Sequence, residues 1–175
     1  MTMKIAQIGE DILRQNAQQV ESKAFSSQAL QQFAEALLNT MLEANGVGIA
    51  APQVFDPRAM MYIASRPNAR YPSAPQMSPL LLINPLITKQ SENGVKDWEG
   101  CLSVPGLRGH ITRPDWVEVT YQNIEGAAKQ QRFEGFVARI FLHEYDHLIG
   151  KTWLDHVQSS QDIVANEVWA AKFAK

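Results

Sequence analysis

The chain has 175 residues, of which 45% are hydrophobic and 19% charged, so it is long enough to bury a core of its own. Its 16 basic and 18 acidic side chains give a net charge of −2, and no basic run interrupts the sequence, which argues against direct nucleic-acid binding. The sequence contains neither the ~18 consecutive apolar residues of a membrane helix nor a secretory apolar core near its first residue. We therefore expect no membrane association and a cytoplasmic location.

A first helix is predicted to follow Ser26 and Ser27, because serine caps helix N-termini and apolar residues then recur at helical spacing up to Met41. Asn45 and Gly46 supply the expected end of this helix, since both tolerate left-handed backbone angles. One face of the helix should therefore pack on the core.

The chain changes character after this helix, where prolines and glycines separate short apolar runs. Apolar or alternating runs predict strands at residues 60–64, 80–83, 116–121 and 131–133. Pro85 marks an edge or a bulge beside the second of these strands. Residues 66–79 carry four prolines and are predicted to form a surface loop.

Two further helices complete the prediction, one over residues 135–148, ended by Gly150, and one from about residue 161 to 173 at the C-terminus. Strands grouped between helices are typical of the α+β class. We expect a single domain over residues 1–175, with short, mostly antiparallel strands wrapped around the helix at 135–148.

Residues 143–147 of this central helix read His-Glu-Tyr-Asp-His. Histidines four residues apart lie on one helix face, so both imidazoles reach one metal ion. Glu144 lies about 100° further round the helix and is placed to move a proton instead of binding the metal. Phe136 and Ile140 precede the histidines at helical spacing, so the histidines continue an inward apolar face, where imidazoles without a partner are costly. Ordinary helix histidines paired with an acidic neighbour are the alternative, and the inward stripe favours the metal.

A catalytic site of this kind uses three protein ligands and leaves one position for water. Downstream, Glu167 is a geometrically possible third ligand, as in a metallopeptidase of the H-E-x-x-H type. Upstream, Cys101 is the only cysteine, so it forms no internal disulfide. Its thiolate is a strong ligand, although a lone cysteine is ordinarily a small buried hydrophobe. The residues alone leave both candidates open.

Three motifs resemble those of the peptide deformylase family. Residues 99–103 match its E-G-C-L-S motif, residues 143–148 its H-E-x-D-H-L motif and residues 46–53 its G-x-G-x-A-A-x-Q motif. They occur in the family's order and at similar separations, and weaker likeness extends from about residue 5 to 155. The resemblance implies a metal-dependent hydrolase of protein biosynthesis, which removes the N-formyl group from the formylmethionine of newly made polypeptides and releases formate.

The resemblance also assigns the metal ligands and the cofactor. Cys101, His143 and His147 are expected to hold one divalent ion, usually Fe²⁺ in this family, with Zn²⁺, Ni²⁺ or Co²⁺ able to substitute. Glu144 is then expected to carry the proton of the attacking water to the leaving amine.

The remaining site residues follow from the same resemblance. The side-chain amide of Gln53 and the N–H of Leu102 are expected to stabilise the oxyanion. Gly46 and Gly48 would let a peptide approach and pair as an added strand. Candidates for an apolar pocket that takes the methionine side chain, each of which equally suits the core, are Ile49, Leu102, Ile140 and Phe141.

The chain also departs from the family pattern. Leu142 stands where glutamine is usual, which predicts altered contacts around the metal, and the loop at 66–78 is longer, which predicts a reshaped rim. Many bacterial members have a basic C-terminal segment thought to meet the ribosome, but residues 161–175 carry only Lys172 and Lys175, so ribosome contact is transient at most. The remaining alternative is a deformylase-like domain that binds peptides without turnover. His110, Arg113 and His156 are assigned structural or surface roles.

Overall fold

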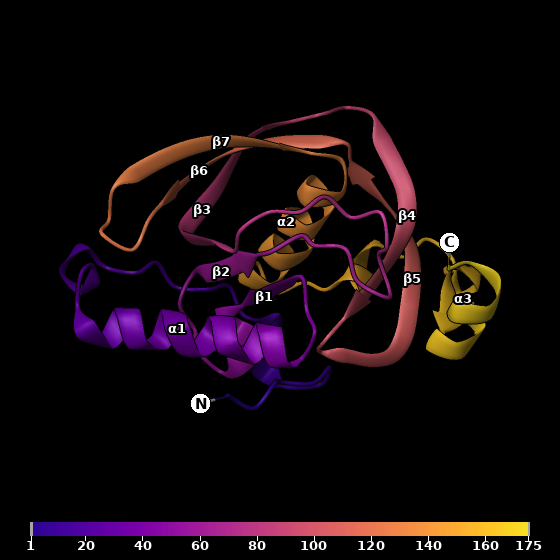
Figure 1. Cartoon of the computed structure of the whole chain (residues 1–175), viewed down its shortest axis with the longest axis horizontal. Helices are drawn as coiled ribbons and strands as arrows, with labels where there is room; N and C mark the ends of the chain where they lie inside the picture. Colours follow the sequence, from indigo (N-terminus) through magenta and orange to yellow (C-terminus); the bar gives the residue numbers. More distant parts are fainter. Residues whose placement is uncertain (1, 175) are drawn as a thin grey trace.

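In the computed structural model, which describes residues 2–174, the strands form two antiparallel sheets that enclose helix α2 (Figure 1). The helices are α1 (Gln28–Glu43), α2 (Gly135–Leu148) and α3 (Asn166–Lys172). The larger sheet has the order β1 (Gly48–Ala50), β2 (Met60–Ile63), β3 (Leu80–Gln90), β6 (Trp116–Gln122) and β7 (Ala128–Glu134), and the smaller sheet has the order β4 (Gly94–Cys101), β5 (Val104–Pro114) and β8 (Ile163–Ala165). Short 3-10 turns are η1 (Asp11–Arg14), η2 (Ser22–Ala24), η3 (Ala51–Val54), η4 (Trp153–His156) and η5 (Ser160–Asp162).

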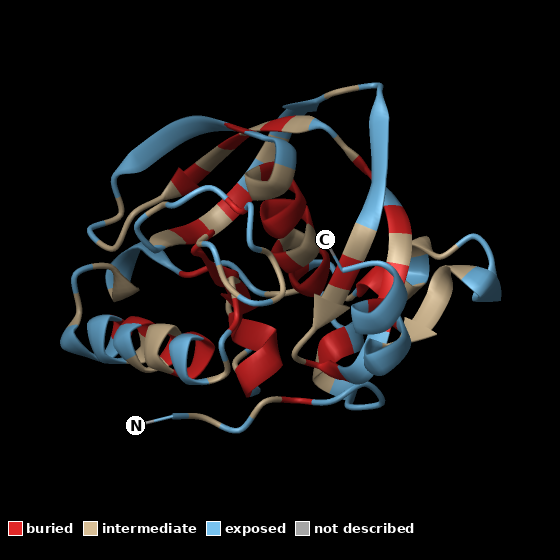
Figure 2. Ribbon diagram, turned by 45° about the vertical axis from the view of Figure 1, so that its right-hand side comes forward, coloured by how far each residue is buried: buried red, intermediate tan, exposed pale blue. Residues whose placement is uncertain are grey.

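Helix α1 begins and ends as its sequence predicts. The Ser27 hydroxyl accepts the backbone N–H of Leu30 at 3.2 Å, which satisfies one of the unpaired donors of the first turn. Beyond the helix, Asn45 has a positive φ of 54°. The buried residues form one stripe while the opposite face is exposed, as Figure 2 shows. The helix therefore covers the molecule from one side only.

The larger sheet follows the alternation of its sequence. Burial along β6 alternates residue by residue, so one face of this strand packs on the core. The register of β3 against β6 shifts between Ile83 and Leu86, which places Pro85 in a bulge. The bulge begins where the pairing of β3 with β2 ends, at Ile83.

The long β4–β5 hairpin is a finding that the sequence pattern did not predict. Only Leu102 and Ser103 form its turn, since Cys101 pairs with Val104 and the ladder extends back to Gly94 and Pro114. The first four residues of β4 are exposed, so the strand lacks the apolar alternation that would have revealed it. Cys101 therefore sits at the last position of a strand.

The C-terminal helix was predicted to begin too early. It begins at Asn166, because residues 163–165 pair with Leu107 to Gly109 of β5 and become β8. Just before it, the Ser159 side chain accepts the N–H of Gln161 and starts the 3-10 turn η5. A strand of three residues is too short to produce a recognisable period.

The main core lies between α2 and the larger sheet. Ala138, Phe141 and Leu142 of α2 pack against buried residues of β2, β3, β6 and β7. Figure 2 shows α2 as the most buried helix, with both sheets around it. The predicted α+β fold with antiparallel strands around a central helix is confirmed. Within residues 2–174, no helix combines the length and apolar character that a membrane crossing needs.

The turn η4 packs against β5 through the fully buried Trp153, and a Cβ atom at Gly109 of β5 would overlap the six-membered ring of this tryptophan. We expect Gly109→Ala to lower the free energy of unfolding by about 1–3 kcal/mol, as overpacking does. Urea unfolding would measure it. In a Trp153→Phe background the smaller ring should reduce the added cost of the alanine. Strictly additive costs would contradict the overlap.

Candidate metal centre and active site

Three potential metal ligands converge from two elements. Cys101 ends β4, while His143 and His147 lie one turn apart on α2, and one ligand atom from each residue lies within 4.8 Å of the others. The Cys101 Sγ is 3.4 Å from His147 Nε2, and the two imidazole rings lie 5.4 Å apart at 72°. The end of β4 and one face of α2 thus bring Cys101 to two histidines that lie more than 40 positions later in the chain.

The chemistry of this donor set fits a divalent metal. His143 Nδ1 donates to Glu99 Oε1 at 2.8 Å, which leaves Nε2 to face the other ligands. Burial and the neighbouring His143 lower the pKa of His147, so its imidazole is neutral, as metal binding requires. A cysteine sulfur with two imidazoles is a common donor set for Zn²⁺ and related ions, and it leaves one position for water.

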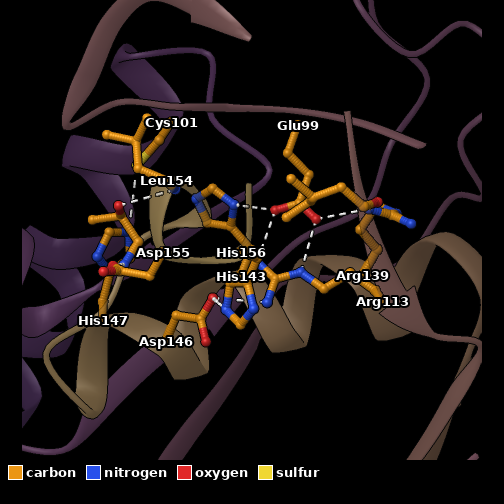
Figure 3. A network of polar contacts seen from close by, with 12 residues as sticks. Glu99, Cys101, Arg113, Arg139, His143, Asp146, His147, Leu154, Asp155 and His156 are labelled. Atoms are coloured by element: carbon orange, nitrogen blue, oxygen red, sulfur yellow. Dashed lines mark hydrogen bonds and ion pairs between the residues drawn. The ribbon is translucent and has the colours of Figure 1, made fainter. Parts of the chain in front are cut away.

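Glu99 lies at the centre of a buried ionic network (Figure 3). Besides His143, it accepts two hydrogen bonds from Arg113, at 2.9 and 3.0 Å, and one from Arg139 at 2.8 Å. Arg113 also donates to Asp146 at 2.7 Å. Burial raises the pKa of a carboxyl, but here Arg113 and His143 outweigh it and hold the pKa of Glu99 well below its usual range. The carboxylate is therefore charged and holds His143 in one orientation.

Glu144 has a different environment from that of Glu99. Its side chain is buried, and its Oε2 has no hydrogen-bond partner among the described residues. Burial, the largest influence, raises the pKa of Glu144 to about 7. Its carboxylate also lies against the backbone of Gly48, where a Cβ atom would come within 2.8 Å of its Cγ. Such a carboxyl exchanges protons readily near neutral pH.

Gln53 lies on the other side of the cysteine. Its Oε1 accepts the N–H of Ala50 at 2.9 Å, and its Nε2 donates to Ser103 at 3.1 Å and lies 3.7 Å from the Cys101 Sγ. Both ends of the amide are thus held, and its second N–H is directed at the cysteine sulfur. Leu102 follows Cys101 in the hairpin turn and lines the same pocket.

The pocket itself contains most of the predicted substrate-binding residues. Gly46, Gly48, Leu102 and Ile140 line it, together with Val47 and Phe136. Ile49 does not, because neighbouring residues of a strand point to opposite faces and Ile49 packs fully buried with Leu37 and Met41 of α1. The prediction for Ile49 was therefore wrong, and Phe141 is likewise a core residue.

Several residues that line the pocket were not predicted from the sequence. The loop at 66–79 brings Arg70 and Tyr71 to the pocket, where Arg70 donates to the Asn45 carbonyl and Tyr71 accepts a hydrogen bond from Arg108 at 2.8 Å. The loop therefore forms part of the rim. Arg139 was also missed, although its position four residues before His143 places it on the inward face.

The structure also shows where Glu167 and Leu142 lie relative to the ligand cluster. Glu167 is exposed on α3 and does not belong to the ligand cluster of the described residues. It therefore does not provide the third ligand that the metallopeptidase alternative requires. Leu142 packs in the main core, 6% exposed, and its side chain offers no hydrogen bond to the site.

Comparison with known proteins agrees with this geometry. The family model for polypeptide deformylase matches residues 2–162. The chain belongs to the polypeptide deformylase family. A peptide deformylase 2 from Shewanella oneidensis is 48% identical over 166 residues, 94% of this chain and 90% of that protein, and one from a Nostoc species is 45% identical over 165 residues, 94% and 91%.

Solved structures of other deformylases have the same fold. A class I type b peptide deformylase from Acinetobacter baumannii, in a Met-Ala-Ser-bound crystal structure, superposes with a TM-score of 0.89 at 43% identity, over 90% of this chain and 99% of that one. The Thermotoga maritima enzyme gives a TM-score of 0.79 at 30% identity, over 91% and 99%. Members of the family are metal-dependent amide hydrolases, and the Cys101, His143 and His147 cluster gives this deformylase a matching donor set.

Glu99→Gln tests the buried network. The amide keeps the shape but removes the charge that compensates Arg113 and Arg139, so we expect the free energy of unfolding to fall by about 3–5 kcal/mol. Metal affinity should fall by about 10–100-fold, because His143 loses its charged partner. Urea unfolding and chelator competition would measure the two effects.

A suitable control for this variant is Glu118→Gln, which removes a half-buried partner of Lys89 and Arg132. It should cost less than about 1 kcal/mol and leave metal affinity unchanged. Equal effects of the two substitutions would refute the special role of Glu99.

Proposed function

We propose that this deformylase hydrolyses the formyl amide of N-formylmethionyl polypeptides, with Cys101, His143 and His147 holding a divalent metal and Glu144 moving the proton. The observation that carries the proposal is the buried Glu144 carboxyl beside the convergent ligand cluster. A divalent ion bound there would supply Lewis-acid chemistry, which acidifies water and polarises a carbonyl.

Glu144 would act first as a base and then as an acid. Its buried Oε2 is free to accept the proton of a water molecule that attacks the formyl carbon. The C–N bond of the amide then breaks, and the same carboxyl returns the proton to the departing amine. A pKa of about 7 suits both transfers, because neither form of the carboxyl is strongly favoured near neutral pH.

Gln53 and Leu102 would stabilise the negative charge that develops on the formyl oxygen. The Gln53 amide is held by Ala50 and Ser103, so its remaining N–H stays directed beside Cys101 without rearrangement. The backbone N–H of Leu102 would provide the second donor. A fixed donor of this kind typically contributes about 3–4 kcal/mol to the transition state.

The polypeptide would bind along β1. This strand is at the edge of the larger sheet, so its outer backbone groups are available to pair with an extended peptide. The methionine side chain would enter the apolar part of the pocket at Val47, Leu102 and Ile140. The Met-Ala-Ser bound to the Acinetobacter baumannii relative is the peptide that remains when formyl-Met-Ala-Ser loses its formyl group, which supports this orientation of the substrate class.

We propose Fe²⁺ as the native ion, with Zn²⁺, Ni²⁺ or Co²⁺ as substitutes, because a thiolate and two imidazoles bind all four. Metal analysis of protein purified anaerobically would identify it. We propose no more than transient contact with the ribosome, since α3 carries a single lysine, Lys172, and Lys175 lies outside the described residues.

Formate release from formyl-Met-Ala-Ser tests the function, and Glu144→Gln tests the mechanism. The metal-loaded parent should release formate, whereas Glu144→Gln should retain one ion per chain and lose about 10²–10⁴-fold in kcat, because the amide cannot carry the proton. The control Glu167→Gln should behave as the parent does. A metal-loaded parent that releases no formate would favour the alternative of a peptide-binding domain without turnover.

Gly48→Ala tests the placement of Glu144. The added methyl group would occupy space next to the Glu144 carboxyl and displace it, so kcat should fall while the metal remains bound. Gly94→Ala is a matched control, because its Cβ meets the side chain of Thr112 on β5, and neither residue lines the pocket. Gly94→Ala should lose stability only. Unchanged turnover in Gly48→Ala would argue against the assigned position of Glu144.

A further inference from the structure

The buried network around Glu99 does not end at Asp146. The Oδ2 atom of Asp146, which accepts from Arg113, also lies 2.8 Å from His156 Nε2. The Asp146 side chain is 7% exposed, whereas that of His156 is 32% exposed. A continuous series of hydrogen bonds therefore runs from His143 through Glu99, Arg113 and Asp146 to a histidine at the surface (Figure 3).

The turn that carries His156 is held at several points. The Thr152 side chain accepts the N–H of Leu154 at 3.2 Å, and Asp155 accepts the N–H of Thr152 at 2.8 Å. Asp155 also pairs with Arg14 of η1 at 2.8 Å, and Trp153 is fully buried. His156 thus reaches Asp146 from a fixed backbone position.

The charges of the network show what His156 contributes. Glu99 and Asp146 carry two negative charges, and Arg113 and Arg139 carry two positive charges, so the four balance without His156. The histidine supplies an N–H donor to a buried carboxylate, which a neutral ring with its proton on Nε2 also provides. Without this donor, Arg113 is the remaining side-chain partner of Asp146 among the described residues, and Arg113 supplies two of the hydrogen bonds that Glu99 accepts.

We propose that His156 is a positioning residue: by donating to Asp146 it fixes Arg113, and through Glu99 it fixes the orientation of the ligand His143. The inference rests on the proposed metal site and adds a residue that touches neither the metal nor the substrate. Partners of metal ligands typically change affinity or activity by about 10–100-fold. His156 acts through three intermediate side chains, so we expect a smaller change, of about fivefold.

The test compares His156→Leu, His156→Gln and Arg14→Ala with the parent, each loaded with Co²⁺. His156→Leu keeps bulk and removes the donor, His156→Gln restores an N–H donor, and Arg14→Ala breaks the Arg14–Asp155 pair of the same turn without touching the network. The measurements are the rate of Co²⁺ release to a chelator, the cobalt absorption spectrum, and kcat and KM for formyl-Met-Ala-Ser.

We expect His156→Leu to release Co²⁺ about fivefold faster, with an altered spectrum and a lower kcat at unchanged KM, and we expect His156→Gln and Arg14→Ala to match the parent. Parental release from His156→Leu would overturn the inference, as would failure of His156→Gln to restore the rate, or an equal effect of Arg14→Ala, which would indicate a general role of the turn. A parent that binds no Co²⁺ would refute the metal site and the inference together.

Discussion

The structure depends on one buried carboxylate, that of Glu99, being fully compensated. Moving a carboxylate out of water costs several kcal/mol, and only well-placed partners offset that cost. Here the partners come from β5 and α2, through Arg113, Arg139 and His143. The smaller sheet and the central helix are therefore fixed to one another by an interaction that tolerates little displacement.

The same interaction links the fold to the chemistry. Glu99 lies two residues before Cys101 on β4, so the strand that brings in one metal ligand also orients another through its hydrogen bond to His143. Glu99 and Glu144 are both buried acids near the same histidines, yet their pKa values move in opposite directions. Arginine surrounds the first and holds it charged, while desolvation dominates the second and favours its protonation. One acid thus maintains the geometry, and the other is available to exchange protons.

The parts of the molecule that the sequence predicted have a strong local signal. The apolar residues of helices α1 and α2 recur at helical spacing, and both helices have recognisable ends. The metal ligands lie in motifs whose combination of residue types is typical of a metal site. The β4–β5 hairpin lacked such a signal, because half of β4 is exposed, and β8 is only three residues long. The inward-facing Arg113 and Arg139 were missed for a further reason. A charged residue in a sequence is ordinarily on the surface, and only the partners across space reveal that it is buried. Ile49 was wrongly placed because the face of a three-residue strand cannot be decided from its own residues.

The position of β1 at the edge of its sheet has a wider consequence. An exposed edge usually invites unwanted pairing with other chains, and proteins keep such edges short. Here the edge is three residues long and opens onto the pocket. A partner that pairs there is held through its backbone, which is the same in every polypeptide. Beyond the first side chain, recognition through the backbone depends little on the sequence of the bound chain. One small protein of this kind is therefore able to bind many chains of different sequence.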